Sequence, residues 1–404
     1  MGEKIRSGRV SSTHRTAAVV LAGYCAFLQL WATQPLLPLL RKIFDASEIG
    51  VSLTVTIPSL GVALSAPFAG FLADRFGRRR VIVWSAFLLG LSALATATAN
   101  SLAQLLFWRF WQGVFTPGVF AVTVAYINDE WRESGAGRTV AAYVSGTVSG
   151  GFSCRVISGF VAAHGPWQRV FVVLGALNLL LAAAIWAWLP EESHPHAARH
   201  GWLTALSSHL RNRQLLAACL VGFCVLFSLV GAFTYVTFYL AAPPFGLQPA
   251  ALGSIFFVYL VGVVVTPVAG RAIDRYGHRS ALSAAIALST AGVALTLIPQ
   301  LWIVAAGLAV CCTGVFIAQA SSSAFVGTTV ATNRALAIGM YSTFYYLGGS
   351  AGGYVPGLFY SRGGWLDCAA FIAAVQVLTI LMALAFWKAK ATAHHADDAR
   401  SISA

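Results

Sequence analysis

Long apolar runs separated by short polar segments dominate the chain. Three stretches, residues 81–108, 214–270 and 280–333, contain no Asp, Glu, Lys or Arg. A helix needs about 20 apolar residues to cross the hydrocarbon core of a bilayer, so each of the two longest stretches can hold a pair of spans. The apolar blocks between charged, Pro or Gly breaks predict twelve transmembrane helices, at 17–40, 50–72, 81–99, 102–127, 139–163, 168–189, 214–241, 250–270, 281–298, 301–327, 335–360 and 366–387.

The composition of the 404 residues agrees with an all-α membrane protein. Hydrophobic residues make up 58% of the chain and charged residues only 10%, and the mean hydropathy is +0.75. A soluble domain is about a quarter charged. A water-soluble globular protein, a disordered chain, collagen and a coiled coil are therefore excluded. The seven cysteines all fall in apolar segments, where we expect them to act as small hydrophobic residues without a disulfide framework.

Basic residues are distributed unevenly between the two sets of predicted loops. A net charge of +13 would suggest nucleic acid in a soluble protein. Here twenty of the 26 Lys and Arg residues lie in the termini and alternate loops of one side, and only four lie on the other, namely Arg41, Lys42, Arg169 and Arg362. Lys and Arg are retained on the cytoplasmic side of membrane proteins. We therefore expect a multi-pass protein of the cell inner (cytoplasmic) membrane with both termini in the cytoplasm and no nucleic-acid partner.

The two halves of the chain repeat each other. Residues 67–79 match residues 267–279 at an offset of 200, and a second register, at an offset of 198, aligns Gly150 with Gly348. Parallel six-helix repeats around a central cavity are a known transporter plan, with the substrate site near the midplane between the repeats. The predicted parts are an N-terminal six-helix bundle at 1–190, a cytoplasmic linker at 191–213 and a C-terminal six-helix bundle at 214–404.

A loop rich in Gly and Arg, at 70–80, joins the second and third predicted helices. Its glycines permit close approach and a sharp turn, and its charged residues can pair across helix ends. The sequence Gly-Phe-Leu-Ala-Asp-Arg-Phe-Gly-Arg-Arg-Arg resembles the signature loop of the major facilitator superfamily, and a degenerate copy lies at 270–279. The resemblance covers the whole chain and implies the major facilitator fold, with two six-helix pseudo-repeats. The candidate gating residues are Gly70, Asp74, Arg75, Gly77, Arg78, Asp129, Asp274 and Arg275.

The resemblance also implies contacts for this loop. In that family the loop Asp caps the start of the eleventh helix and the loop Arg pairs with an acid at the end of the fourth. Asp74 is therefore expected to face the helix start near Ala335, and Arg78 to pair with Asp129. Both contacts would hold the cytoplasmic side shut and would break when the cavity opens inward.

Two arginines stand inside predicted spans. Arg109, followed by Gln112 and a glycine, resembles the family's second motif, and Arg155 lies at similar depth on the next helix. Arg109 lies about eight residues from the outer end of its span, roughly 12 Å at 1.5 Å per residue, and Arg155 lies about nine residues from the outer end of its own. All thirteen acids fall in loops or at span ends, so neither arginine has an acidic partner at its own depth. Two interpretations stay open: the substrate is anionic, or both guanidiniums are bonded to backbone carbonyls.

The fifth predicted helix departs from the pattern of proton-coupled drug exporters. Residues 146–155 occupy the place of their Gly-x-x-x-Gly-Pro-x-x-Gly-Gly motif, with Gly151 in place of the Pro and Cys154-Arg155 in place of the final pair. This departure argues against simple proton antiport. The run at 33–38, with the Gly150-Gly151 and Arg155 pattern, is most similar to the YnfM-like efflux permeases. That similarity implies export, coupled to protons in related members.

Polar and aromatic positions on the predicted cavity helices are the further candidates for substrate binding. Aromatic faces with a few polar groups suit small organic ligands, although for any one aromatic a packing role is the commoner one. Trp31, Trp186 and Trp188 fit interfacial anchors. Beside Arg109 and Arg155, the candidates are Tyr24, Gln29, Gln34, Gln112, Tyr235, Tyr239, Gln319, Tyr345 and Tyr346.

The function predicted is secondary active transport of a small organic solute by alternating access, as proton-coupled efflux. The alternatives are an importer or exchanger of organic anions that uses Arg109 and Arg155, and a transporter-like sensor. A membrane enzyme is disfavoured, because its chemistry would need His, Asp or Glu within the spans. The partners expected are the solute, the lipid bilayer and protons. We expect a monomer with no cofactor and no metal.

Overall fold

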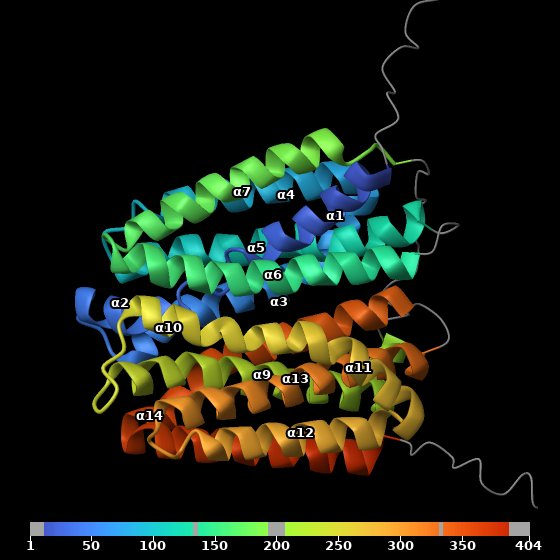
Figure 1. Cartoon of the computed structure of the whole chain (residues 1–404). Coiled ribbons are helices and arrows are strands. Elements are labelled where there is room, and N and C mark those ends of the chain that lie inside the picture. The colour runs from blue at the N-terminus through green and yellow to red at the C-terminus, as the bar shows by residue number, and fades with distance from the viewer. Residues whose placement is uncertain (1–11, 132–135, 193–206, 331–333, 388–404) are drawn as a thin grey trace, which may run out of the picture.

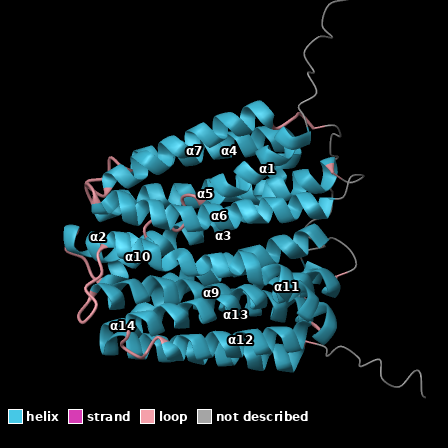
Figure 2. Cartoon of the chain, in the orientation of Figure 1, coloured by secondary structure: helices cyan, strands magenta, loops and turns pink. Residues whose placement is uncertain are grey.

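Helices account for the regular structure of the described chain. The computed structural model describes residues 12–131, 136–192, 207–330 and 334–387, and no strand occurs among them (Figure 2). The first half contains α1 (Ser12–Phe27), α2 (Leu37–Ile43), α3 (Glu48–Phe76), α4 (Arg78–Thr96), α5 (Leu102–Glu130), α6 (Ala136–Ala163) and α7 (Gln168–Trp188). The second half contains α9 (Arg213–Ala241), α10 (Pro249–Ile255), α11 (Leu260–Tyr276), α12 (His278–Leu295), α13 (Leu301–Thr329) and α14 (Arg334–Phe386).

These helices form the twelve spans that the sequence predicts. By length and composition alone, seven described helices could cross a membrane. The other five are α6, α12, two broken spans and the second part of α14, which bends at Gly363 and Gly364. The first span consists of α1, a 3₁₀ turn at Gln34–Leu36 and α2; the eighth consists of α10, a 3₁₀ turn at Phe256–Tyr259 and α11. The predicted linker at 191–213 lies largely outside the described residues.

The two halves lie next to each other, with their helices running between two ends of the molecule (Figure 1). The first turn of α1, the last turn of α14 and the α3–α4 and α11–α12 turns lie at one end, to the right in Figure 1. We name it the basic end, because it carries the arginine-rich loop. α2 lies at the other end, which we name the opposite end.

Both copies of the Gly-rich loop make the same tight turn. Gly77 alone separates α3 from α4, and Gly277 alone separates α11 from α12. Their φ angles are +90° and +81°, in a region that glycine occupies without a steric penalty. The turn predicted for Gly77 is therefore present, and its counterpart repeats it.

The halves touch near the opposite end. A side chain on Gly159 of α6 would collide with the backbone of Pro249 in α10, and a side chain on Gly353 of α14 would collide with Thr56 of α3. Small residues let helices approach this closely in membranes. Near the basic end, glycines of the same spans have no atom within 4 Å of the place a side chain would take; they are Gly70, Gly137, Gly270 and Gly339. The halves are therefore packed together at the opposite end, whereas these glycines at the basic end have no packed neighbour.

Candidate functional site

The first span unwinds in the middle of the first half. α1 ends at Phe27, and residues 28–33 form turns instead of helix. Pro35 and Pro38 follow directly. Each proline lacks an N–H donor and clashes with the carbonyl four residues earlier, so a regular helix cannot continue through this segment. Carbonyl groups freed inside a bilayer need partners from the protein.

Arg109 supplies those partners. Its Nη1 donates to the carbonyl of Gln29 at 2.7 Å and its Nη2 to the carbonyl of Leu30 at 2.6 Å. Its Nε donates to the carbonyl of Thr54 on α3 at 3.0 Å. The side chain is 0% exposed. Arg109 therefore stabilises the unwound segment and is buried in this conformation, which agrees with the carbonyl-bonded interpretation; its role in substrate binding stays a prediction.

Two predicted cavity glutamines belong to the same buried network. The Gln112 side chain accepts a hydrogen bond from Arg109 and donates to Oγ1 of Thr96 at 2.9 Å. Gln29 donates to the carbonyl of Leu174 on α7 at 3.1 Å. Both glutamines are fully buried. They join helices of the first half in this conformation, and their role as cavity residues stays a prediction.

Arg155 on α6 occupies a different environment. It is 3% exposed, and its Nε donates to Oε1 of Gln34 at 2.6 Å. Its Nη1 donates to the carbonyl of Gly151. The guanidinium lies over the rings of Phe256 and Tyr259, 4.9 and 4.5 Å from their centroids. Both rings belong to the 3₁₀ turn that breaks the eighth span, so Arg155 connects the break in one half to the break in the other.

Gln34 extends this connection across the halves. Its Nε2 donates to Oγ1 of Thr234 on α9 at 3.3 Å. Trp31 completes the surroundings of Arg155, with its ring centroid 5.6 Å from the guanidinium carbon. At 6% exposure Trp31 is buried, so its prediction as an interfacial anchor is wrong. Arg155, Gln34 and Trp31 with their second-half partners form what we name the Arg155 cluster: Trp31, Gln34, Arg155, Thr234, Phe256 and Tyr259.

Sequence reasoning missed four members of this cluster. Thr234, Phe256 and Tyr259 were not singled out, and Trp31 was placed elsewhere. The prolines at 35 and 38 could have indicated that the first span breaks beside Trp31. Nothing comparable marks the second break, because residues 256–259 read as an ordinary apolar run.

The remaining substrate-binding candidates differ in whether their side chains form hydrogen bonds. Tyr235 is fully buried, and its hydroxyl donates to the Gly353 carbonyl at 2.8 Å; it packs α9 against α14 and does not face an open cavity in this conformation. Tyr239 stacks on Trp365, with centroids 5.8 Å apart. In the described part of the chain, Tyr24, Gln319, Tyr345 and Tyr346 have no side-chain hydrogen bond. Tyr24 and Gln319 are half-buried, whereas Tyr345 and Tyr346 are buried, and a ligand-binding role of all four stays a prediction.

An aromatic contact between α5 and α14 joins the two halves next to Tyr345. The ring of Phe120 on α5 lies 6.3 Å from that of Tyr346 on α14, edge to face. Tyr345 makes a similar contact with Tyr346 at 5.5 Å. Phe27, at the end of α1, contacts Phe120 at 5.4 Å. The end of the continuous α1 helix is thus linked through aromatic rings to the second half.

The loop contacts implied by the resemblance are present in part. Arg78 forms the expected ion pair with Asp129 and donates to the Ala125 carbonyl at 2.6 Å. Both partners lie on α5, in the same half as Arg78, and the expectation that the pair breaks when the cavity opens inward stays a prediction. Asp74 is exposed and makes no hydrogen bond to any described residue. The partner expected for it, the helix start near Ala335, lies at the edge of the described residues, so this contact stays a prediction.

The second copy of the loop resembles the first. Asp274 and Arg275 lie at the end of α11, and both are exposed. Arg75 and Arg275 each lie over the ring of the following aromatic residue, 5.5 Å from Phe76 and 5.4 Å from Tyr276. Asp274 lines a cavity of about 500 Å³ at the basic end of the second half. The gating role of these residues stays a prediction.

The comparisons with known proteins agree with this architecture. The Major Facilitator Superfamily profile matches residues 19–263 and 232–403. The chain is 30% identical to the uncharacterized MFS-type transporter YybF of Bacillus subtilis, over 95% of this chain and 94% of that protein. It is 30% identical to the inner membrane transport protein YnfM of Escherichia coli, over 94% and 91% of the two chains.

Solved structures of low identity share the fold. A bacterial homolog of the human lysosomal transporter Spinster, in an inward-facing and unoccupied conformation, superposes with a TM-score of 0.73 at 16% identity, covering 93% of this chain and 96% of that one. The nucleoside transporter NupG gives a TM-score of 0.72 at 16% identity, covering 92% and 100%. The family profile matches well over half of the chain, and the chain belongs to the Major Facilitator Superfamily, a family of membrane transporters and not of enzymes.

Proposed function

We propose that this protein is a secondary transporter that moves a small organic solute across the cytoplasmic membrane by alternating access. The observation that carries the proposal is the unequal packing of the halves. Gly159 and Gly353 contact the other half near the opposite end, whereas Gly70 and Gly339 have no close neighbour near the basic end. A molecule closed at one end and separated at the other is one of the two states that alternating access requires.

The basic end is proposed to face the cytoplasm. It carries the loops in which Lys and Arg are concentrated, and the positive-inside rule assigns such loops to that side. The conformation described here would then be open toward the cytoplasm. We place the N-terminal bundle at 1–190 and the C-terminal bundle at 214–404, joined by a linker at 191–213.

The Arg155 cluster supports an organic anion as the solute. Of the two arginines inside the spans, Arg109 is engaged with three carbonyls of its own half. Arg155 lies between the halves against aromatic rings, and its Nη2 makes no hydrogen bond within the described chain. A carboxylate could pair with those remaining donors while an aromatic or aliphatic group contacts the rings.

A related transporter suggests the first compound to test. The chain is 30% identical, over 208 residues and half of its length, to the 3-(3-hydroxy-phenyl)propionate transporter of Escherichia coli. An aryl propionate combines the carboxylate and the ring that the Arg155 cluster would accept. We therefore propose small aromatic carboxylates as the first substrate class.

Direction and coupling stay proposals. The resemblance to YnfM-like permeases favours export. Within the described residues every Asp and Glu lies near an end of the bundle, so we propose that any proton coupling does not pass through a mid-membrane carboxylate.

Transport into vesicles tests the proposal. Radiolabelled 3-phenylpropionate and its neutral analogue 3-phenylpropanol should be compared in proteoliposomes, with and without a proton gradient, and empty liposomes serve as the control. Saturable movement of the acid supports the anion transporter, and dependence on the gradient identifies proton coupling. If neither compound moves faster than in empty liposomes, and a wider panel of solutes behaves in the same way, transport is contradicted and a sensor is favoured.

A further inference from the structure

A small cavity opens between α4 and α7 at the basic end. It has a volume of about 200 Å³ and is lined by Arg79, Arg80, Val83, Trp84 and Trp186. Figure 1 shows α4 and α7 side by side at the upper edge of the molecule, away from the second half. The cavity therefore faces the surroundings of the bundle and is separate from the Arg155 cluster.

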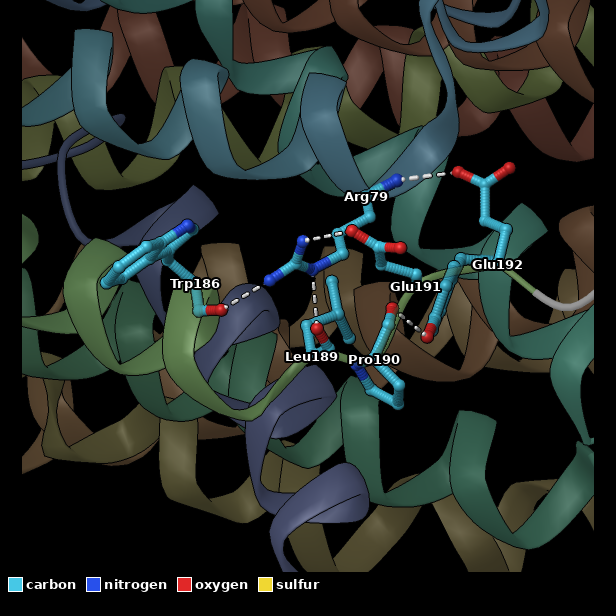
Figure 3. A network of polar contacts seen from close by, with 7 residues as sticks. Arg79, Trp186, Leu189, Pro190, Glu191 and Glu192 are labelled. Carbon is cyan, nitrogen blue, oxygen red and sulfur yellow. Dashed lines mark hydrogen bonds and ion pairs between the residues drawn. The ribbon is translucent and has the colours of Figure 1, made fainter. Parts of the chain in front are cut away.

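Arg79 lines this cavity, and Figure 3 shows its polar contacts. Its Nε donates to the Leu189 carbonyl at 2.6 Å and its Nη2 to the Trp186 carbonyl at 2.8 Å. Its backbone N–H donates to Oε1 of Glu192 at 2.8 Å. These bonds hold the end of α7 against the start of α4 and fix the backbone of Trp186. Most donors of Arg79 are thus engaged by the protein.

Arg80 is the available charge of the cavity. It is exposed, and the described chain gives its side chain no hydrogen bond or ion pair. The indole rings of Trp84 and Trp186 beside it are 62% and 61% exposed. Tryptophan rings with neighbouring cations are typical of the level of lipid headgroups. Exposed Phe87 and Leu91 continue from Trp84 along α4 toward the middle of the span.

The second half provides an internal comparison. At the offset of 200, Arg79 is matched by Arg279, whereas Arg80 and Trp84 are matched by Ser280 and Ala284. The same helix start is formed in α12 with those smaller residues. The fold therefore does not require the residues that give the first-half cavity its free charge and its aromatic face.

We propose that this cavity binds the headgroup of an anionic phospholipid, such as phosphatidylglycerol, from the leaflet at the basic end. Arg80 pairs with the phosphodiester, the rings of Trp84 and Trp186 flank the glycerol, and the acyl chains follow Phe87 and Leu91. Basic pockets between transmembrane helices on the cytoplasmic side bind such headgroups. The volume of about 200 Å³ is below the range of roughly 300–1,000 Å³ typical of pockets for drug-sized ligands, so a headgroup fits better than a whole organic solute.

Lipid retention tests this site. The full-length protein in neutral detergent is titrated with phosphatidylglycerol or phosphatidylcholine, and bound lipid is counted by native mass spectrometry. The test variant Arg80→Ser with Trp84→Ala installs the residues of the second half, so the fold should tolerate it. Arg211→Ser, which removes an exposed charge at the basic end of the other half, is the matched control.

Wild type and Arg211→Ser should bind phosphatidylglycerol in preference to phosphatidylcholine. The double variant should bind it at least about fivefold more weakly, the factor expected for one surface arginine. Equal binding by the double variant and wild type, or no preference between the two lipids, would overturn the proposal. Displacement of the lipid by millimolar inorganic phosphate would also overturn it, because the cavity would then be a site for free phosphate.

Discussion

The two halves of this transporter share one fold but differ in where their charged residues and helix breaks lie. The first half contains Arg109 and a span that unwinds over residues 28–33. In the second half, the first span is α9, a continuous helix of 29 residues that is almost entirely buried, and no Lys or Arg occurs between residues 214 and 270. The second half breaks its second span instead, where the rings of Phe256 and Tyr259 meet Arg155.

This difference indicates why a buried arginine is tolerated where it is. A charge inside a membrane protein needs compensation, and an unwound helix has carbonyls without partners. In the first half the two requirements satisfy each other, since Arg109 donates to Gln29 and Leu30. Residues 214–270 of the second half contain no charged residue, and the charge that lies against their Phe256 and Tyr259 rings comes from Arg155 of the first half. Arg109 therefore stabilises the first half internally, whereas Arg155 lies at the contact between the two halves.

The largest effect is expected for Arg109→Ala. The change leaves the carbonyls of Gln29, Leu30 and Thr54 without their donor. Each unsatisfied buried group costs about 1–3 kcal/mol, so we expect a loss of several kcal/mol in total and little folded protein. Detergent-solubilised yield and the thermal midpoint measure it. A variant with wild-type yield and thermal midpoint would show that these three hydrogen bonds are not needed for folding. It would contradict the proposed difference between the two halves.

A shift in conformation is expected for substitutions at the two kinds of glycine. Gly159→Val should collide with Pro249 and disfavour the present state, whereas Gly339→Val meets no neighbour in it. Spin labels at the exposed residues Asn100 and Gln300 report the separation of the halves at the opposite end. We expect a longer distance in at least about half of the Gly159→Val molecules, an energetic bias of about 1 kcal/mol or more. Identical distance distributions for both variants and wild type would contradict the assignment of the closed end.

A smaller and more selective effect is expected for Asp74→Asn. Because Asp74 has no hydrogen bond to a described residue, the free energy of unfolding should change by less than about 0.5 kcal/mol. Transport should nevertheless fall, since the predicted contact with α14 would form only when the basic end closes. Arg78→Ala is the contrast, because it removes the ion pair with Asp129 and should lower stability by about 1–3 kcal/mol. Normal transport by Asp74→Asn would remove this residue from the gate.

The spans could be predicted from the sequence because they depend on the length and polarity of segments. Stretches such as 280–333 leave few ways to divide an apolar chain. The break at 28–33 could not be predicted from hydropathy, which measures only how apolar a segment is. Pro35 and Pro38 do not by themselves indicate a break, because membrane helices tolerate proline. The roles of the two arginines also could not be separated. Depth along the span is nearly the same for both, and their roles depend on where the unwound segment passes, which only the packed structure shows.

The most direct test of the account measures what Arg155 contributes to ligand binding in folded protein. Arg155→Ala and Arg155→Lys are purified beside wild type, and the affinities for 3-phenylpropionate and 3-phenylpropanol are measured by calorimetry after the thermal midpoint has shown that each variant is folded. The account predicts that Arg155→Ala binds the acid about tenfold or more weakly, as expected for loss of a charged hydrogen bond, and that the lysine variant is less affected, with the alcohol unchanged. Wild-type affinity of Arg155→Ala for the acid would contradict the assignment of the Arg155 cluster as an anion site.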